Sequence, residues 1–258
     1  MITKNELTEY FIKGIKSKTN LKIGVEHEKF ILKQNTFKTV SYYEQNGIKN
    51  ILEKLTTIGW TPLYDDNQHT IIALKRGKEA ITLEPGGQIE LSGAPLDNIH
   101  ETCEETTNHL RELKKLGNEL NFILLGMGVE PNLGLDDFPW MPKQRYGIMK
   151  KYMKKVNTLG HHMMKRTCTN QVNIDYSSEE DMVEKFRIML NLEAIATAMF
   201  SNSPFDQGKI SKYKSLRSHF WHHTDPDRTG LLPFIFEKGF SFENYTDYAL
   251  SVPMYFVN

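Results

Sequence analysis

Two short segments of the chain carry paired polar side chains that could bind a metal ion. Glu26 and Glu28 lie two residues apart, and Gln88 and Glu90 repeat this spacing further along. Side chains at positions i and i+2 of a strand project from the same face, so each pair would be aimed at one place. Neighbouring carboxylates repel each other unless a hard cation or a basic partner neutralises them. We therefore interpret both segments as metal-binding strands; the alternative for each is an ordinary solvated strand or hairpin face.

Glu84 and the segment 169–175 add further oxygen ligands to this interpretation. Pro85 and two glycines follow Glu84 and form a turn that could return its side chain toward the same site. Within 169–175, Gln171 and Asn173 alternate with apolar residues. Three such strands would form a concave sheet suited to Mg²⁺, which prefers carboxylate, amide and water oxygens. The sequence has no Walker loop or other glycine-rich phosphate motif, so nucleotide phosphates would have to be held through metal ions and basic side chains.

Four arginines are candidates for binding an anionic substrate. Arg145, Arg166, Arg217 and Arg228 lie in three segments that are rich in basic residues, and the last two are surrounded by tryptophan, proline and glycine. The planar guanidinium can form a bidentate hydrogen bond with a carboxylate or a phosphate. The alternative for any one of them is a surface ion pair.

Three histidines have a spacing that can bind a transition metal on a helix. His219, His222 and His223 stand at i, i+3 and i+4, but Pro226 follows closely and predicts a loop here. We therefore treat a transition-metal site as the minor interpretation of this segment.

The elements that must position these residues can be predicted from hydrophobic periodicity. Helical spacing predicts helices at residues 41–58, 97–120 and 179–200, with Asp97 and Ser178 as N-caps of the last two. The residues expected to face inward are Ile48, Ile51, Leu52 and Leu55 in the first helix, Ile99, Cys103, Leu110, Leu113, Leu116 and Leu120 in the second, and Met182, Phe186, Met189, Leu190 and Ile195 in the third.

Short alternating segments predict strands between these helices, at residues 21–32, 71–74, 79–84, 88–92, 121–127 and 168–175. The segments 71–74 and 79–84 are joined across Gly77 and should form a hairpin. We therefore expect an α+β fold with a mainly antiparallel sheet. Nothing in the sequence marks a domain boundary, so we expect residues 1–258 to form a single domain.

Composition limits the class of partner. The 258 residues include 32 basic and 32 acidic side chains, so no net field favours nucleic acid or an anionic membrane. The first residues lack the features of a signal peptide, and we expect a soluble, cytoplasmic protein. Cys103 and Cys168 are too few for a disulfide framework, and we expect both to be small core residues.

Seven segments, in order and with compatible spacing, resemble the plant and proteobacterial type of glutamate cysteine ligase. They read Glu-His-Glu-Lys-Phe (26–30), Leu-Glu-Pro-Gly-Gly-Gln-Ile-Glu-Leu-Ser-Gly-Ala-Pro-Leu (83–96), Met-Pro-Lys-Gln-Arg-Tyr (141–146), Arg-Thr-Cys-Thr-Asn-Gln-Val-Asn-Ile-Asp (166–175), Arg-Ser-His (217–219), Asp-Arg-Thr-Gly-Leu-Leu-Pro-Phe (227–234) and Asp-Tyr-Ala-Leu-Ser-Val-Pro-Met-Tyr-Phe (247–256). The similarity extends from about residue 20 to the end of the chain.

The resemblance implies a fold and a reaction. The expected fold is a curved, mainly antiparallel sheet of the glutamine synthetase-like type, with helices on its outer face and a site for Mg²⁺ and ATP on its concave face. The expected reaction joins glutamate to cysteine: ATP phosphorylates the γ-carboxylate of glutamate, and the amine of cysteine then displaces phosphate, in the first step of glutathione biosynthesis. The expected partners are therefore glutamate, cysteine and ATP.

The resemblance also assigns roles to individual residues. The expected metal ligands are Glu26, Glu28, Glu84 and Glu90, with Gln171 and Asn173 supporting the metal or the nucleotide. The expected catalytic and substrate-binding residues are Arg217 at the glutamate carboxylate, Arg145 near the cysteine end, Tyr255 in the cysteine pocket, and Arg166 and Arg228 without a defined contact.

The end of the chain departs from the family pattern. Members of the family continue well beyond the motif at 247–256, whereas this chain stops at Asn258, so we expect the catalytic domain to be incomplete at its C-terminus. Cys103 matches one half of a family disulfide whose partner would lie beyond this point, and we expect a free thiol here. Three alternatives remain open: a glutamate ligase that uses another amine, a non-catalytic truncated paralogue and, with less support, a metal-dependent phosphohydrolase.

Overall fold

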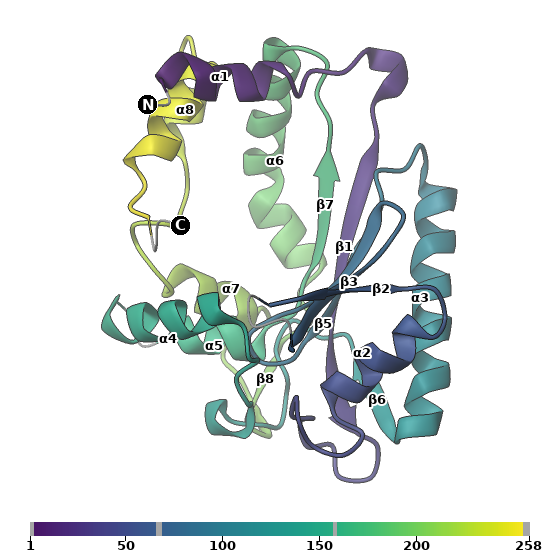
Figure 1. Ribbon diagram of the computed structural model, residues 1–258. Helices are drawn as coiled ribbons and strands as arrows, with labels where there is room; N and C mark the ends of the chain where they lie inside the picture. Colours follow the sequence, from purple (N-terminus) through teal and green to yellow (C-terminus); the bar gives the residue numbers. More distant parts are fainter. Residues whose placement is uncertain (1–2, 66–68, 157–158, 255–258) are drawn as a thin grey trace.

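The computed structural model describes residues 3–65, 69–156 and 159–254 (Figure 1). In these residues the main sheet has seven strands, in the order β2-β3-β4-β5-β1-β6, with β7 also paired to β1, and every pairing is antiparallel. The strands are β1 (Ile23–Lys33), β2 (Thr61–Tyr64), β3 (Ile71–Arg76), β4 (Glu79–Leu83), β5 (Ile89–Ser92), β6 (Phe122–Leu125) and β7 (Asn170–Ile174), and a separate two-stranded sheet contains β8 (Phe205–Asp206) and β9 (Lys209–Ile210).

Helices lie on two sides of this sheet and beyond one end of it. Figure 1 shows α2 and α3 on one side, α4, α5 and α7 gathered on another, and α1 beside α8 at the far end of β1. The α-helices are α1 (Lys4–Ile12), α2 (Ile48–Thr56), α3 (Ile99–Leu120), α4 (Gln144–Val156), α5 (Gly160–Arg166), α6 (Glu179–Met199), α7 (Leu216–His222) and α8 (Phe242–Ser251), and the 3-10 helices are η1 (Lys18–Asn20), η2 (Leu135–Asp137) and η3 (Pro233–Phe236). The predicted α+β class is confirmed, and the sheet is open.

The six predicted strands correspond to β1 and β3 to β7. The β3–β4 hairpin is also present, and Gly77 at its turn has a φ of +59°, a left-handed conformation that glycine adopts without strain. The short strands β2, β8 and β9 were not predicted. The strands β8 and β9 have only two residues each, too few to show an alternating pattern, and β2 contains Pro62, which argues against a strand.

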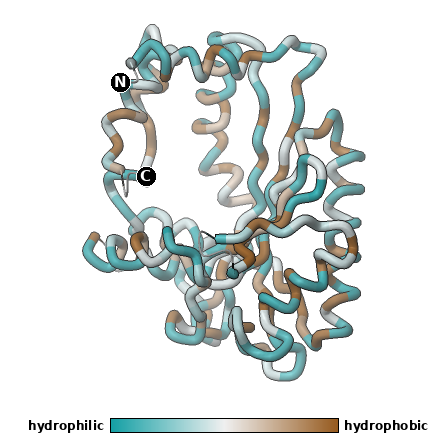
Figure 2. The backbone as a smooth tube through the Cα atoms, viewed as in Figure 1, coloured by the Kyte–Doolittle hydropathy of each residue, from teal (hydrophilic) through white to brown (hydrophobic). Residues whose placement is uncertain are grey.

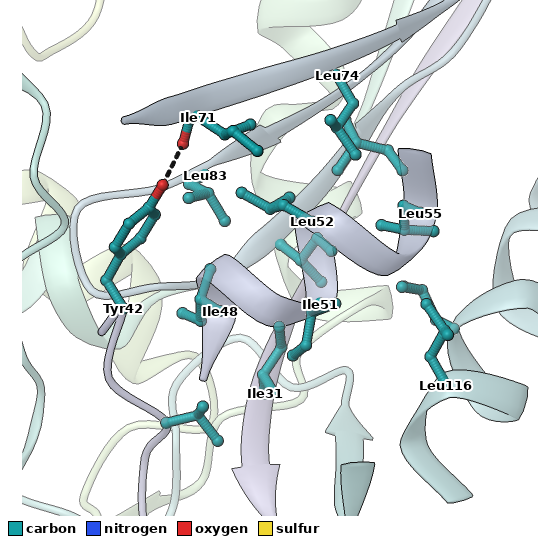
Figure 3. Packing of buried hydrophobic residues seen from close by; sticks show 14 of the residues in the cluster. Ile31, Tyr42, Ile48, Ile51, Leu52, Leu55, Ile71, Leu74, Leu83 and Leu116 are labelled. Atoms are coloured by element: carbon teal, nitrogen blue, oxygen red, sulfur yellow. Dashed lines mark hydrogen bonds between the residues drawn. The ribbon is translucent and has the colours of Figure 1, made fainter. Parts of the chain in front are cut away.

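The main core lies between α2 and the sheet (Figure 3). The four residues predicted for the inner face of this helix, Ile48, Ile51, Leu52 and Leu55, are all buried. Across from them, the Tyr42 hydroxyl donates a hydrogen bond of 2.8 Å to the carbonyl of Ile71. Figure 2 shows hydrophobic residues concentrated along α2 and the central strands. Each fully buried aliphatic side chain contributes about 1.5–3 kcal/mol of hydrophobic free energy, so this layer holds the sheet firmly in place.

Two helix boundaries differ from the prediction. The first helix begins at Ile48, not at residue 41, because Asn46 adopts a left-handed φ of 58° that a right-handed helix cannot include. The N-cap of α3 is Asn98, whose side-chain oxygen accepts hydrogen bonds from the backbone N–H groups of His100 and Glu101. Asp97 instead forms an ion pair with Lys22.

Two residues predicted to be buried on α3 are exposed. Ile99, in the first turn, is 67% exposed, and Cys103 is a free, exposed thiol. Successive residues of a helix are turned by about 100°, and Thr102 takes the inward position of that turn. Cys103 therefore points to solvent, whereas Cys168 is buried as predicted.

The inner face of α6 was only partly predicted. Ser178 is the N-cap, as expected, and Met182 is buried with Phe186 and Leu190 packed around the same cluster. Met189 and Ile195, however, are 45% and 55% exposed. The helix carries a second apolar stripe, which includes Leu192, and within the described residues this stripe is left exposed. Hydrophobicity alone could not show which of the two stripes packs against the other elements of the fold.

Candidate active site

The register of the sheet brings the predicted polar residues onto one face. Glu28 of β1 lies directly opposite Glu90 of β5. On the other side of β1, Glu26 lies opposite Gln171 of β7. Directly paired residues of neighbouring strands point to the same face of a sheet, so the two acidic segments and β7 do converge.

Glu28, Glu84 and Glu90 form a group that we call the carboxylate cluster. The pKa of Glu28 is raised to about 8, first by burial and then by the charges of Glu84 and Glu90, against the opposing effects of the Thr169 N–H and the Arg217 charge. The pKa of Glu84 is also raised, first by burial and then by the charge of Glu90. With a pKa of about 8, the carboxyl group of Glu28 keeps its proton near neutral pH.

Hydrogen bonds fix the orientation of two of these carboxyl groups. The hydroxyls of Thr82 and Ser92 each donate a hydrogen bond of 2.7 Å to Glu90. The backbone N–H of Thr169 donates a hydrogen bond of 2.9 Å to Glu28. Because these donors lie on the neighbouring strands β4 and β5 and just before β7, the sheet itself holds the cluster in place.

The third carboxyl group depends on the turn between β4 and β5. The N–H of Gly87 donates to the carbonyl of Glu84 at 2.9 Å, and Gly87 has a left-handed φ of 89°. At Gly86, an added Cβ would lie 2.4 Å from the carbonyl oxygen of Lys165, so only glycine fits against α5. Gln88 turns its amide away from the cluster and donates to the carbonyls of Met164 and Thr167. These contacts explain why the turn contains two glycines and how it carries Glu84 back to the cluster.

Arg217 approaches the cluster from α7. Its charge acts on Glu28, and burial lowers the pKa of Arg217 itself. The Nε atom of Arg217 is buried and has no hydrogen-bond partner among the described residues. A guanidinium that is desolvated and incompletely paired is poised to bind an anion.

Arg145 and Lys143 lie near Glu84 and Glu90, at the start of α4. Both cations lower the pKa of Glu84. Burial and the neighbouring Arg145 lower the pKa of Lys143 to about 8, and its Nζ donates a hydrogen bond of 2.8 Å to the carbonyl of Leu83. Sequence reasoning missed Lys143 as a site residue. The signal was present, because Lys143 lies two residues before Arg145 in the segment 141–146.

Glu26, Gln171 and Asn173 form a separate, more exposed polar row. The amide of Asn173 donates to Glu26 at 3.0 Å, and the amide of Gln171 donates to Asn173 at 3.1 Å. Glu26 thus has amide neighbours, whereas Glu28 has carboxyl neighbours. A role for this row in binding a metal or nucleotide stays a prediction.

The remaining predicted substrate residues have other contacts. Arg166 is 0% exposed and donates hydrogen bonds to Asp206 at 2.7 Å and to His162 at 3.0 Å. Arg228 donates to Asp225 and to the hydroxyl of Tyr152. These contacts tie both arginines to the protein, and their roles in substrate binding stay predictions. Tyr255 lies outside the described residues.

The carboxylate cluster fits a hard divalent cation by its chemistry. Carboxylate oxygens are preferred ligands of Mg²⁺, and a bound cation would favour the ionised forms of Glu28 and Glu84, which burial and neighbouring carboxylates disfavour. Within the described residues, no group of three or more His, Cys, Asp or Glu side chains is already arranged around a common metal position. Binding an ion through all three groups would therefore require Glu28 to lose its proton and the carboxyl groups to draw together.

The pKa of Glu28 gives a testable dependence of stability on pH. An ordinary glutamate titrates near 4.5 and Glu28 titrates near 8 in the fold, so between these values the folded chain binds more protons than the unfolded chain. The free energy of unfolding therefore falls as pH rises through this range. In metal-free protein, Glu28→Gln should raise the melting temperature at pH 8 and change it little at pH 5, and each kcal/mol gained corresponds to about 2–4 °C.

A matched control for this measurement is Glu104→Gln, which alters an exposed carboxylate on α3. It should leave the melting temperature nearly unchanged at both pH values. An equal shift for Glu28→Gln at pH 5 and pH 8 would show that Glu28 does not carry a raised pKa.

Comparison with curated proteins gives close relatives. The chain is 51% identical over 257 residues to glutamate–cysteine ligase A, chloroplastic, of Oryza sativa subsp. japonica, a match that covers 99% of this chain and 51% of the rice protein. It is 49% identical over 259 residues to the chloroplastic glutamate–cysteine ligase of Arabidopsis thaliana, covering 99% of this chain and 48% of that protein. The chain thus spans about half the length of the curated relatives it matches.

These relatives correct one prediction. A cytoplasmic protein was expected from the first residues of the chain, but the rice, Arabidopsis and Solanum lycopersicum proteins are all named as chloroplastic enzymes. The cytoplasmic assignment is therefore wrong. Among the described residues, no helix is both long and apolar enough to cross a membrane.

A family model agrees with these relatives. The model described as glutamate-cysteine ligase family 2 (GCS2) matches residues 22–258, which include the carboxylate cluster, Lys143, Arg145 and Arg217. The match covers nearly the whole chain, in agreement with the level of identity to the plant enzymes. The chain belongs to the glutamate-cysteine ligase family 2.

Proposed function

We propose that this chain provides the glutamate- and nucleotide-binding part of a glutamate cysteine ligase. In the proposed reaction, ATP transfers its γ-phosphoryl group to the γ-carboxylate of glutamate, and the amine of cysteine then displaces phosphate to form the amide bond. The observation that carries this proposal is the half-buried carboxylate cluster, which has Arg217 near Glu28 and Lys143 and Arg145 near Glu84. Acidic groups that can hold a cation, next to basic groups that can hold anions, are the parts that phosphoryl transfer needs.

Arg217 would bind glutamate through a carboxylate. Burial has removed water from its guanidinium, and its Nε hydrogen-bond donor is unused among the described residues. A substrate carboxylate would satisfy that donor and replace the lost hydration, which makes binding favourable. The backbone N–H of Arg217 donates to the hydroxyl of Ser203 at 3.2 Å, so the start of α7 is anchored before substrate arrives.

Lys143 and Arg145 would stabilise the negative charge that develops on the phosphoryl group. Lys143 and the hydroxyl of Tyr146 both donate to the carbonyl of Leu83, the residue before Glu84. The start of α4 therefore holds the β4–β5 turn and the two cations in one rigid unit. Fixed charges of this kind need no rearrangement as the reaction proceeds.

A divalent cation, Mg²⁺ in this proposal, would be held by Glu28, Glu84 and Glu90 and would neutralise phosphate oxygens when bound. The sheet would then be of the glutamine synthetase-like type, with this site on its concave face. Support for that arrangement comes from α2 and α3: they pack on the face of the sheet that carries Ile31, Ile81 and Leu91, whereas the cluster lies on the opposite face.

The choice of amine separates this proposal from its alternatives. Arg145 and Tyr255 are the residues expected to contact cysteine, and Tyr255 is outside the described residues. A ligase that joins glutamate to a different amine would use the same carboxylate cluster, Arg217 and ATP chemistry. A non-catalytic paralogue would retain only a surface that binds a metal or a ligand, without ligase activity.

The test is an assay of ADP formation by the longest protein that the reading frame encodes. With glutamate, ATP and Mg²⁺ present, cysteine should give ADP and γ-glutamylcysteine in equal amounts, and other amino acids should give much less. Turnover with another amine but not with cysteine would favour the alternative ligase. ATP hydrolysis without any amide product would contradict both.

A substitution at Arg217 tests the assignment of its role. Arg217→Lys keeps the positive charge but loses the bidentate hydrogen-bond donor. Glutamate binding should therefore weaken by about 1.5–3 kcal/mol, the range for a hydrogen bond to a charged group. The measurement is the KM for glutamate at saturating ATP and cysteine, compared with the melting temperature.

The control is Arg111→Lys, an exposed arginine of α3 whose guanidinium donates a hydrogen bond to the side chain of Asn108. It should change neither quantity. If Arg217→Lys lowers the melting temperature but leaves the KM for glutamate unchanged, Arg217 is a structural residue that pairs with Glu28.

A further inference from the structure

Two histidines lie against each other at the C-terminal end of α7. His219 is within the helix and His223 is its C-cap, one turn later. The two imidazole rings have centroids 4.4 Å apart and planes inclined by 54°. The sequence favoured a loop at this point, but α7 continues to His222 and so brings this pair onto one side of the helix.

The hydrogen bond of His223 fixes which nitrogen is free. Its Nδ1 lies 2.9 Å from the backbone carbonyl oxygen of His219. A carbonyl can only accept a hydrogen bond, so Nδ1 must carry the proton and Nε2 of the neutral ring must carry the lone pair. Histidines that bind metals in proteins are commonly oriented by this contact, with one ring nitrogen donating to a carbonyl and the other bound to the ion.

The ring of His219 is held in place by a neighbouring aromatic side chain. Its ring stacks on Tyr213, with centroids 4.2 Å apart and planes inclined by 18°. Burial lowers the pKa of His219, and the charges of His223, Lys212 and His222 lower it further. The neutral imidazole is the form that binds metal ions, and stacking on Tyr213 limits the rotation of His219 that would otherwise be lost on binding.

We propose that His219 and His223 form a binding site for a single transition-metal ion, of the Cu²⁺, Ni²⁺ or Zn²⁺ class, with water completing the coordination. Imidazole nitrogens bind such ions at about 2.0–2.1 Å, and two rings on adjacent coordination positions then lie within about 5 Å of each other. The pair is separate from the carboxylate cluster, whose oxygen atoms suit Mg²⁺.

Neighbouring residues determine the number of protein ligands at this site and the charge close to it. Within the described residues, no third His, Cys, Asp or Glu joins the pair as a three-ligand group, so the ion has two protein ligands. The ammonium of Lys212 lies 5.0 Å from the centre of the Tyr213 ring and disfavours a second positive charge nearby. Removing that charge should therefore tighten metal binding.

The test measures Cu²⁺ binding by titration calorimetry and by electron paramagnetic resonance. Excess Mg²⁺ is present in both experiments to occupy sites formed by oxygen ligands. The protein carries Cys103→Ser, because an exposed thiol would itself react with Cu²⁺. We expect one ion per chain and a spectrum with two coordinated imidazole nitrogens. His219→Gln and His223→Gln should each weaken binding by at least about tenfold, since loss of even an outer partner of a metal ligand costs this much.

Three further variants complete the design. His222→Gln and His100→Gln, both exposed histidines, should leave Cu²⁺ affinity unchanged, and Lys212→Gln should increase it. Circular dichroism shows whether each variant keeps its fold. Wild-type affinity in folded His219→Gln or His223→Gln, a spectrum with oxygen donors only, or equal losses in His100→Gln would each overturn the proposal. Loss of binding in His222→Gln with normal binding in His223→Gln would also overturn it.

Discussion

Mutual repulsion between Glu28, Glu84 and Glu90 is the constraint on which the rest of the site depends. Three carboxyl groups can be kept together away from water only if the backbone beneath them is stiff and positive charge is close. The antiparallel register that sets Glu28 opposite Glu90, and the fully buried Ile81, Ile89 and Leu91 of the neighbouring strands, provide the stiffness. Arg217, Lys143 and Arg145 provide the charge, but burial and the charges of Glu84 and Glu90 still raise the pKa of Glu28.

The helices around the site are linked to one another through a second set of buried polar contacts. Arg166, at the end of α5, pairs with Asp206 of β8, and its guanidinium lies 5.8 Å from the ring of Phe220 on α7. This arrangement joins α5, the small sheet and α7 around a buried cation. The position of α7, and with it the positions of both Arg217 and the histidine pair, therefore depends on an ion pair that is remote from the carboxylate cluster.

Local patterns in the sequence predicted the strands and the face on which the acidic residues lie, because side chains alternate along a strand whatever its neighbours are. The same reasoning could not identify Lys143 as a site residue, since its place beside Glu84 results from the packing of α4 against the β4–β5 turn. It also chose Met189 and Ile195 as buried, because α6 has more apolar surface than the described chain covers. The sequence could not distinguish Asp97 from Asn98 as the N-cap of α3, because both residue types cap helices. In the structure Asn98 is the N-cap, and Asp97 forms an ion pair with Lys22 instead.

The central claim is that Glu28 of the carboxylate cluster holds a proton that a divalent cation must displace. Titration of the protein with Mg²⁺ by calorimetry, in buffers with different ionisation enthalpies, measures the number of protons released on binding. Because Glu28 has a pKa of about 8, the account predicts release of about one proton per ion near pH 7, and less release in Glu28→Gln. Binding of Mg²⁺ with no proton release in the wild-type protein would contradict it.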